Sequence, residues 1–208
     1  MPNPPYYYLD ANAFVQLIVT DTCTDRVKEI FTNLSSIKVL STLTLLETHS
    51  TIFRLRHENK ITEGELLSLK SEIAKTWQPD PSKYPGVTKT LIKRVIQPTY
   101  YEKAIKIIEE CRNLRSLDAL HLAMAFEYKN SKINFVTGDK ELILSAPKEG
   151  LQITNLNYCR CPICGNDTIQ LFLDKKNNKR IGRKCSHCNL KECDPCNVSV
   201  CVKYTMKV

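Results

Sequence analysis

The sequence lacks the features of a membrane or exported protein. It has no run of eighteen or more apolar residues, which excludes a transmembrane helix and disfavours a membrane partner. Its first six residues, Met-Pro-Asn-Pro-Pro-Tyr, show neither the basic start nor the apolar stretch of a secretory signal. We therefore expect a cytoplasmic protein.

Glycine is scarce, with 6 residues among 208, and neither a GxGxxG pattern nor a Walker-type loop occurs. Folds that hold a nucleotide phosphate on a glycine-rich backbone are therefore disfavoured.

The composition that remains is that of an ordinary globular protein. Hydrophobic residues make up 42% of the chain and charged residues 25%, which excludes a disordered or fibrous protein. A length of 208 residues suits one substantial domain with a small appendage, or one large domain. The net charge of +8 favours a polyanionic partner. Most of this charge lies in residues 159–208, which hold ten basic and four acidic side chains.

Apolar runs and helical periodicity alternate over residues 1–157. Strands are expected at 6–9, 38–40, 91–96 and 133–137. Helices are expected at 12–19, 25–34, 42–58, 63–77, 99–112, 117–129 and 140–144. Ser41 or Thr42, Thr62 or Glu63, and Ser116 suit the starts of three of these helices. Such alternation predicts an α/β/α fold, a parallel sheet with helices on both faces and a ligand site at the carboxyl ends of the strands.

Four acidic residues fall where such a fold gathers its functional groups. Asp10 and Asp139 follow expected strands, and Asp118 lies in the first turn of a helix. Glu47 lies on the 42–58 helix, at the edge of an expected core stripe. That stripe comprises Leu45, Leu46, Ile52 and Phe53.

Each acid alone could be a turn residue or a solvated helix residue, but together they would meet at one edge of the sheet. Two carboxylates about 5 Å apart repel by about 3 kcal/mol at an effective dielectric constant near 20. Four converging carboxylates would therefore take up protons or bind divalent cations. Oxygen ligands of this kind select magnesium or manganese.

The acidic residues lie in four motifs. In chain order these are Leu9-Asp10-Ala-Asn12, Glu47, Leu117-Asp118-Ala-Leu-His121-Leu-Ala123 and Val136-Thr137-Gly-Asp139. Together the motifs resemble those of the PIN-domain nucleases, and in particular the toxins of VapBC-type toxin–antitoxin pairs. The resemblance covers about residues 5–156.

The resemblance implies a metal-dependent endoribonuclease that prefers single-stranded RNA. It assigns the Mg²⁺ or Mn²⁺ ligands to Asp10, Glu47, Asp118 and Asp139. Thr137 would orient the site, and Asn12 fits a polar position of the family pattern. The expected mechanism is in-line attack by a magnesium-bound water, leaving 5′-phosphate and 3′-hydroxyl ends. His121 is expected to be a packed helix residue rather than a general base.

Eight of the ten cysteines crowd into the last fifty residues. With no export signal, metal ligation is favoured over disulfides. Cys161-x-x-Cys164 and Cys185-x-x-Cys188, twenty residues apart, predict a zinc ribbon around one structural Zn²⁺. A second zinc, an iron–sulfur cluster, or ligation by Cys193 and Cys196 stays open. Cys159 and Cys201 are unassigned.

These patterns divide the chain into a PIN-like domain at 1–157 and a zinc-ribbon domain at 158–208. Basic residues on or beside the ribbon hairpin would hold RNA phosphates, or would only keep an exposed turn soluble. They are Lys175, Lys176, Lys179 and Arg180.

Other interpretations remain open. Most VapBC toxins lack a zinc ribbon, so an RNA-processing nuclease is one alternative. A DNA-directed nuclease and a non-catalytic RNA- or protein-binding module are others. The resemblance also implies an antitoxin protein as a partner and a homodimer.

Overall fold

The computed structural model describes residues 4–18, 24–83, 85–111 and 113–156, and four strands in the remaining C-terminal part. The chain divides into two compact units, residues 1–155 and 156–208. Each unit is described by itself.

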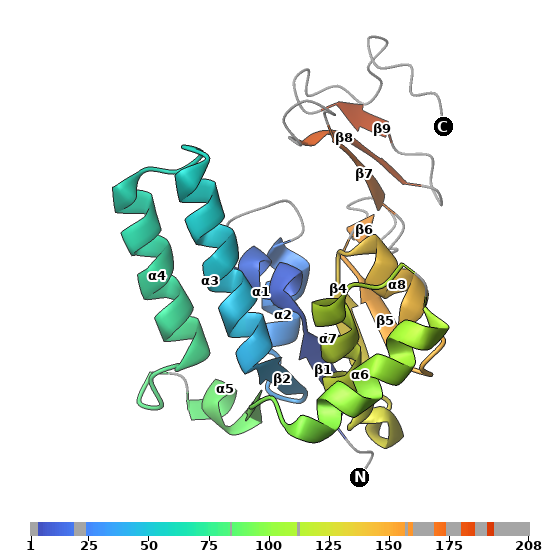
Figure 1. Ribbon diagram of the computed structural model, residues 1–208. Coiled ribbons are helices and arrows are strands. Elements are labelled where there is room, and N and C mark those ends of the chain that lie inside the picture. The colour runs from blue at the N-terminus through green and yellow to red at the C-terminus, as the bar shows by residue number, and fades with distance from the viewer. Residues whose placement is uncertain are drawn as a thin grey trace. The chain divides into compact units, whose positions relative to one another are not determined.

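The N-terminal unit is built on a parallel five-stranded sheet in the order β3-β2-β1-β4-β5 (Figure 1). The strands are β1 Tyr6–Leu9, β2 Ile37–Ser41, β3 Leu91–Arg94, β4 Asn134–Thr137 and β5 Gln152–Asn155. The predicted parallel sheet is confirmed, and β1 has its predicted limits. β5, a short run at the edge of the sheet, was not predicted.

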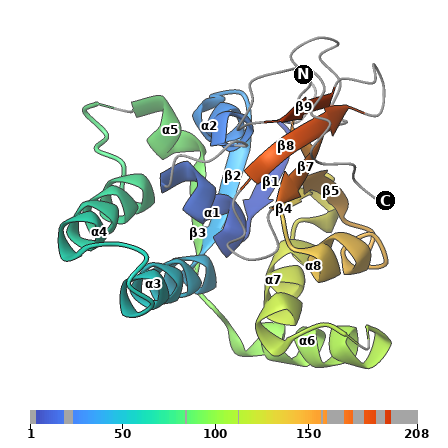
Figure 2. The same cartoon turned by 90° about the horizontal axis from the view of Figure 1, so that it is seen from above.

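Helices cover both faces of this sheet. They are α1 Ala11–Ile18, α2 Thr24–Thr32, α3 Thr42–His57, α4 Glu63–Trp77, α5 Pro85–Thr90, α6 Pro98–Glu110, α7 Ser116–Phe126 and α8 Lys140–Ser145, with a 3₁₀ turn at Lys129–Ser131. In Figure 2, α3 and α4 lie on one side of the strands, and α6, α7 and α8 lie on the other. The prediction of an α/β fold with helices on both faces is confirmed.

Side-chain caps set the starts of two long helices, as predicted. The Ser41 hydroxyl accepts a hydrogen bond from the backbone N–H of Thr44 at 3.0 Å and begins α3. In return, the side chain of Thr44 accepts the Ser41 N–H, which completes a capping box. Thr62 and Glu65 form a second capping box in the same way at the start of α4. At α7 the prediction was wrong: Arg115, not Ser116, occupies the cap position, without a side-chain hydrogen bond.

The predicted core stripe of α3 is also wrong in part. Of its four members only Ile52 is buried, whereas Leu46 is 63% exposed and Phe53 is 39% exposed. The buried face of α3 is instead formed by Leu43, Thr44, Thr48 and Ile52. Polar contacts decide this rotation, because the Thr44 hydroxyl donates to the Leu9 carbonyl at 3.1 Å, at the end of β1. The spacing of apolar residues alone does not reveal such a hydrogen bond.

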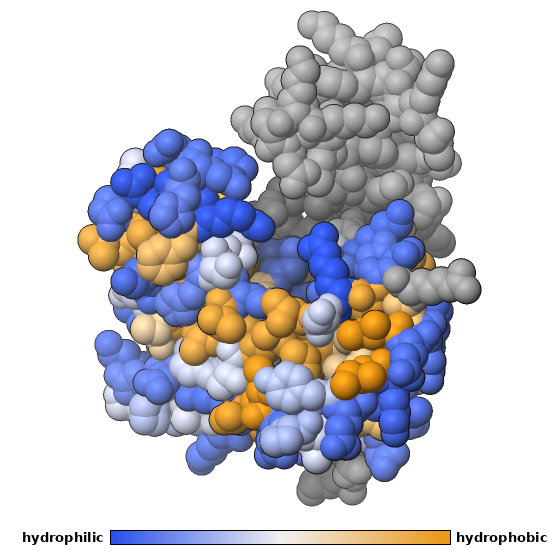
Figure 3. Space-filling model, viewed as in Figure 1, coloured by the Kyte–Doolittle hydropathy of each residue, from blue (hydrophilic) through white to orange (hydrophobic). Residues whose placement is uncertain are grey.

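One large cluster of buried apolar side chains joins β1 and β4 to α6 and α7. Tyr8, Phe135, Leu122 and Met124 are all 0% exposed. The ring of Tyr8 stacks on that of Phe135, with centroids 5.2 Å apart. Some large apolar side chains remain on the surface, and Figure 3 shows apolar surface over the middle of one face.

The C-terminal unit contains an antiparallel sheet in the order β6-β7-β8-β9. Its strands are β6 Tyr158–Cys159, β7 Ile169–Leu173, β8 Arg180–Cys185 and β9 Lys191–Cys193. Ile169 of β7 is in register with Cys159 on one side and with Cys185 on the other. In the part of the chain that the structure describes, no helix is long and apolar enough to span a bilayer.

The predicted zinc and RNA ligands of this unit are mostly outside the described residues. That applies to Cys161, Cys164, Cys188, Lys175, Lys176 and Lys179. Cys185 is the last residue of β8 and Arg180 is the first.

Candidate active site

Two central strands of the sheet bring the first functional side chains together. β1 and β4 are parallel neighbours, with Leu9 in register with Val136. Asp10 directly follows β1, Thr137 ends β4, and Asp139 comes two residues later. Because parallel strands end at the same edge of the sheet, these side chains share the edge where α/β proteins bind ligands.

Asp10 is almost entirely buried, with 3% of its surface exposed. Its Oδ1 accepts a hydrogen bond from the backbone N–H of Ala13 at 2.7 Å, and its Oδ2 accepts one from the Thr137 hydroxyl at 2.5 Å. Burial raises the pKa of Asp10 from 3.8 to about 6; these hydrogen bonds and His121 oppose the rise, and Glu47 adds to it. A cation bound beside this carboxyl group would stabilise its ionised form.

Asp139 occupies the start of α8. Its Oδ1 accepts hydrogen bonds from the backbone N–H groups of Glu141 and Leu142, at 2.8 and 3.1 Å. Its own N–H donates to the Thr137 hydroxyl oxygen at 2.9 Å. Thr137 therefore bridges Asp10 and the segment that positions Asp139.

Asp118 stands in the first turn of α7 and is partly buried. Burial raises the pKa of its carboxyl group, and the negative charges of Asp139 and Glu47 raise it further. His121 opposes this rise in pKa. Glu47 lies on α3, so helices on opposite sides of the sheet bring its charge near Asp118.

Glu47 is on α3, and its Oε2 lies 2.9 Å from Nε2 of His121. The other ring nitrogen of His121, Nδ1, lies 2.9 Å from the Tyr8 hydroxyl. His121 is 1% exposed, so it is a packed residue, but one with a contact to the acidic site. Tyr8 was not predicted as a site residue. The sequence feature that places His121 near the site is its position one helical turn after Asp118.

Asn12 is not part of this arrangement in the structure. Its side chain is exposed on α1, and its Oδ1 accepts a hydrogen bond from Gln16 at 3.2 Å. We therefore give it no part in the site.

The charge of Glu47 raises the pKa of Asp10, and the charges of Asp139 and Glu47 raise that of Asp118, but the four acids are not gathered around one point. Among the described residues, no group of three or more histidine, cysteine, aspartate or glutamate side chains is arranged to hold a metal ion. Asp10, Asp139 and Glu47 each direct an oxygen at a donor of the protein instead. Carboxylate oxygens are the ligands that a hard divalent cation prefers, and these side chains would have to move closer together to bind one.

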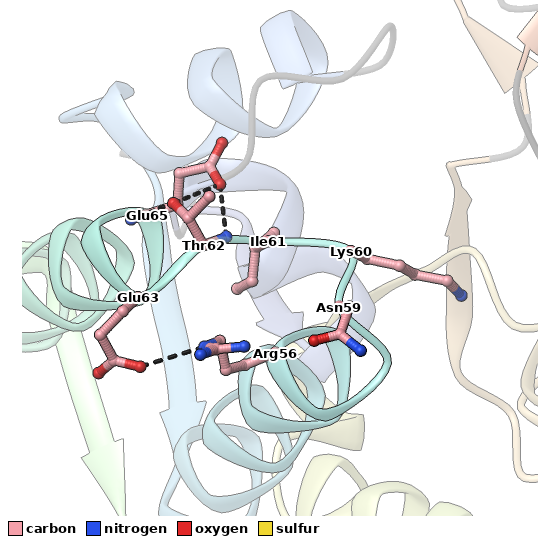
Figure 4. Close-up of a pocket in the computed structure, with 7 residues that line it drawn as sticks. All are labelled: Arg56, Asn59, Lys60, Ile61, Thr62, Glu63 and Glu65. Atoms are coloured by element: carbon pink, nitrogen blue, oxygen red, sulfur yellow. Dashed lines mark hydrogen bonds and ion pairs between the residues drawn. The ribbon is translucent and has the colours of Figure 1, made fainter.

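A surface depression of about 360 Å³ lies elsewhere, at the turn between α3 and α4 (Figure 4). In it Arg56 forms an ion pair with Glu63 at 3.1 Å, and Glu65 binds the backbone N–H of Thr62. These contacts belong to the start of α4, so the depression is explained by helix capping.

The fold and the acidic edge together define an α/β protein with Asp10 and Asp139 just beyond the carboxyl ends of two neighbouring parallel strands. The family model of the PIN domain matches residues 7–146. The chain therefore belongs to the PIN domain family, whose members are generally nucleases that use divalent metals such as Mg²⁺. The resemblance seen in the sequence is confirmed at the level of the family.

Several solved structures are similar to this chain, whereas no curated protein matches it. FitAcB from Neisseria gonorrhoeae shares 12% identity at a TM-score of 0.47, covering 72% of this chain and 97% of its own. PAE2754 from Pyrobaculum aerophilum shares 18% at 0.46, covering 74% and 92%. VapC20 from Mycobacterium tuberculosis, described as a toxin that cleaves the sarcin–ricin loop, shares 13% at 0.47, covering 66% and 93%.

Proposed function

We propose that this protein is a metal-dependent endoribonuclease that hydrolyses phosphodiester bonds of single-stranded RNA. Membership of the PIN family supports a nuclease. The observation that carries the proposal is the burial of Asp10 between Thr137 and the start of α1, with its pKa raised to about 6. A buried acid that pairs with no lysine or arginine of the described residues destabilises a fold, so its position favours a role with a cation.

The residues that would hold the cation are Asp10, Glu47, Asp118 and Asp139. All four offer carboxylate oxygens, the ligand type that Mg²⁺ and Mn²⁺ prefer. When bound, such an ion supplies charge neutralisation and an activated water for attack on a phosphodiester.

The chain's own groups prepare the site before any substrate arrives. Thr137 holds one oxygen of Asp10 and accepts the N–H of Asp139, which keeps these acids at the ends of adjacent strands. Asp118 projects from the first turn of α7, where the half-buried setting raises its pKa. Fixed orientation of this kind lowers the reorganisation that the reaction requires.

For the C-terminal unit we propose a structural zinc ribbon with Cys161, Cys164, Cys185 and Cys188 as ligands. Four thiolates suit a closed tetrahedral zinc site, and the antiparallel strands β7 and β8 suit a ribbon. Cys193 and Cys196 are the alternative to Cys185 and Cys188, and the eight cysteines together could hold two zinc ions. Elemental analysis of the purified protein separates one zinc, two zincs and iron.

We also propose that this unit holds RNA through Lys175, Lys176, Lys179 and Arg180. Their clustered positive charge supports contact with a phosphate backbone. Neutralising the four residues should weaken RNA binding and flatten its dependence on salt. Unchanged binding would leave them a role in solubility alone.

An antitoxin protein and a second copy of the chain are the proposed protein partners, and the cytoplasm is the proposed location. An apolar stripe on α6 supports a protein partner: Tyr101, Ile105 and Ile108 are 51%, 57% and 37% exposed and follow helical spacing. Light scattering of the purified chain tests the homodimer. Co-purification with the product of a neighbouring small gene tests the antitoxin.

The decisive experiment for the function is cleavage of single-stranded RNA in Mg²⁺ or Mn²⁺. The wild type should cut, and Asp118→Asn or an excess of EDTA should abolish cutting. Cleavage that persists in EDTA would reject the mechanism. A wild type that binds RNA without cutting it would favour a non-catalytic binding module. Preferential cutting of single-stranded DNA would favour a DNA-directed nuclease.

A further inference from the structure

His121 is the residue through which Glu47 is tied to the protein core. Its Nε2 lies 2.9 Å from Oε2 of Glu47, while the imidazole is 1% exposed and the glutamate side chain 24%. An ionised carboxylate can only accept a hydrogen bond, so Nε2 carries the hydrogen and donates it to Glu47. The contact crosses the sheet edge, from α7 to α3.

The imidazole is itself held in place by Tyr8 of β1. Nδ1 of His121 is 2.9 Å from the Tyr8 hydroxyl, and the two rings meet edge to face with centroids 5.7 Å apart. Tyr8 is 0% exposed and stacks on Phe135, so neither ring can turn without disturbing the core.

The same network returns to the helix that carries Glu47. The Tyr8 and Ser41 hydroxyl oxygens are hydrogen-bonded at 3.0 Å, and Ser41 caps α3. Glu47, His121, Tyr8 and Ser41 therefore form one chain of hydrogen bonds. This chain links α3 to β1 and α7, and it fixes α3 both at its N-cap residue and at the acidic side chain.

We propose that His121 is a positioning residue that holds Oε2 of Glu47 and leaves Oε1 free to bind the divalent cation of the site. This inference rests on the proposed function, because it assigns Glu47 to the cation. A free glutamate side chain loses rotamer entropy when it is fixed on a metal ion, and a side chain that is already held loses less. Ligands held by such outer hydrogen bonds bind metal more tightly, with losses of 10–100-fold typical when the bond is removed.

Burial excludes a direct role for His121 in proton transfer to RNA. Both of its ring nitrogens face protein groups, Glu47 and Tyr8, and its surface is 1% exposed. Its effect on the reaction therefore passes through the position of Glu47.

Mn²⁺ titration calorimetry of the full-length protein tests this role without relying on RNA cleavage. His121→Leu removes the donor to Glu47 and should weaken Mn²⁺ binding by roughly tenfold or more. His121→Gln keeps an N–H donor and should recover most of the affinity. Tyr8→Phe removes only the hydroxyl behind the imidazole and should weaken binding by a smaller factor.

Leu122→Val is the matched control for packing. Leu122 is 0% exposed and lies on α7 beside His121, so its truncation loosens the same helix. It should lower the melting temperature and leave Mn²⁺ affinity unchanged. Equal weakening by Leu122→Val and His121→Leu, or wild-type affinity in His121→Leu, would overturn the proposal. If His121→Leu does not fold, wild-type affinity in Tyr8→Phe overturns it.

The outcomes separate this inference from the nuclease assignment. A wild type that binds Mn²⁺ but leaves RNA intact, with binding weakened in His121→Leu, supports the role of His121 and rejects the nuclease. Efficient cleavage with no effect of His121→Leu on Mn²⁺ affinity rejects only the inference. A wild type that binds no Mn²⁺ rejects both.

Discussion

The hydroxyl of Thr137 donates a hydrogen bond to Oδ2 of Asp10 across two adjacent parallel strands. The same hydroxyl oxygen accepts the backbone N–H of Asp139 at 2.9 Å. One small side chain thus connects the two acids that follow β1 and β4. It also opposes the rise in the pKa of Asp10 that burial causes.

Replacing Thr137 tests this connection. Thr137→Val keeps the shape of the side chain but leaves Asp10 Oδ2 and the Asp139 N–H without their partner. We expect a loss of stability of about 1–3 kcal/mol in urea unfolding and a large loss of RNA cleavage. Thr137→Ser keeps the hydroxyl and should retain most of both, and equal behaviour of the two variants would contradict the role of the hydroxyl.

The raised pKa of Asp10 predicts how stability depends on pH. The folded carboxyl group holds its proton up to about pH 6, whereas the unfolded one releases it near 3.8. The folded state therefore binds more protons between these values, and the free energy of unfolding should fall as pH rises through this window, by roughly 3 kcal/mol. Above pH 7 this contribution should be constant.

Asp10→Asn should remove this dependence of the free energy of unfolding on pH. The amide has no charge to bury, so the variant should be more stable than the wild type near pH 7.5 in metal-free buffer, by roughly 2–3 kcal/mol. It should also lose RNA cleavage, because it lacks the ionised oxygen. Urea unfolding at pH 4.5 and 7.5 measures both stabilities. A wild type equally stable at both pH values, with no gain from Asp10→Asn, would refute the destabilisation assigned to the buried Asp10 charge.

The two capping boxes provide a matched pair of stability tests. Thr62 caps α4 on an exposed surface, so Thr62→Ala should cost about 1 kcal/mol and leave cleavage unchanged. Ser41 is buried and is also hydrogen-bonded to the Tyr8 hydroxyl, so Ser41→Ala should cost more, about 2 kcal/mol, and reduce cleavage. Thermal and urea unfolding beside an RNA cleavage assay compare them, and equal effects of the two variants would exclude the link through Tyr8.

The parts of the fold that follow from local sequence were predictable. The apolar runs before Asp10 and Asp139 placed β1 and β4, and the hydroxyl at position 41 placed the start of α3. The sequence order of strands and helices then implied a common edge for the acids. Edge strand β5 is short and has no strong pattern, so it was missed.

The contacts that depend on tertiary packing were not predictable. The rotation of α3 follows from the bond between Thr44 and the Leu9 carbonyl, which links residues 35 positions apart. The pairing of His121 with Glu47 spans 74 positions. A single sequence gives the residue types of such pairs but not their distance. Asn12 matched a motif position, yet the orientation of α1 leaves it on the surface.

Cleavage of RNA at the acidic edge of the sheet with a divalent cation can be tested on a labelled single-stranded RNA. The RNA is incubated with wild-type protein and with Asp118→Asn, each in Mg²⁺ and in EDTA. We expect 5′-phosphate products from the wild type in Mg²⁺ alone. Equal cleavage by Asp118→Asn, or by the wild type in EDTA, would contradict it.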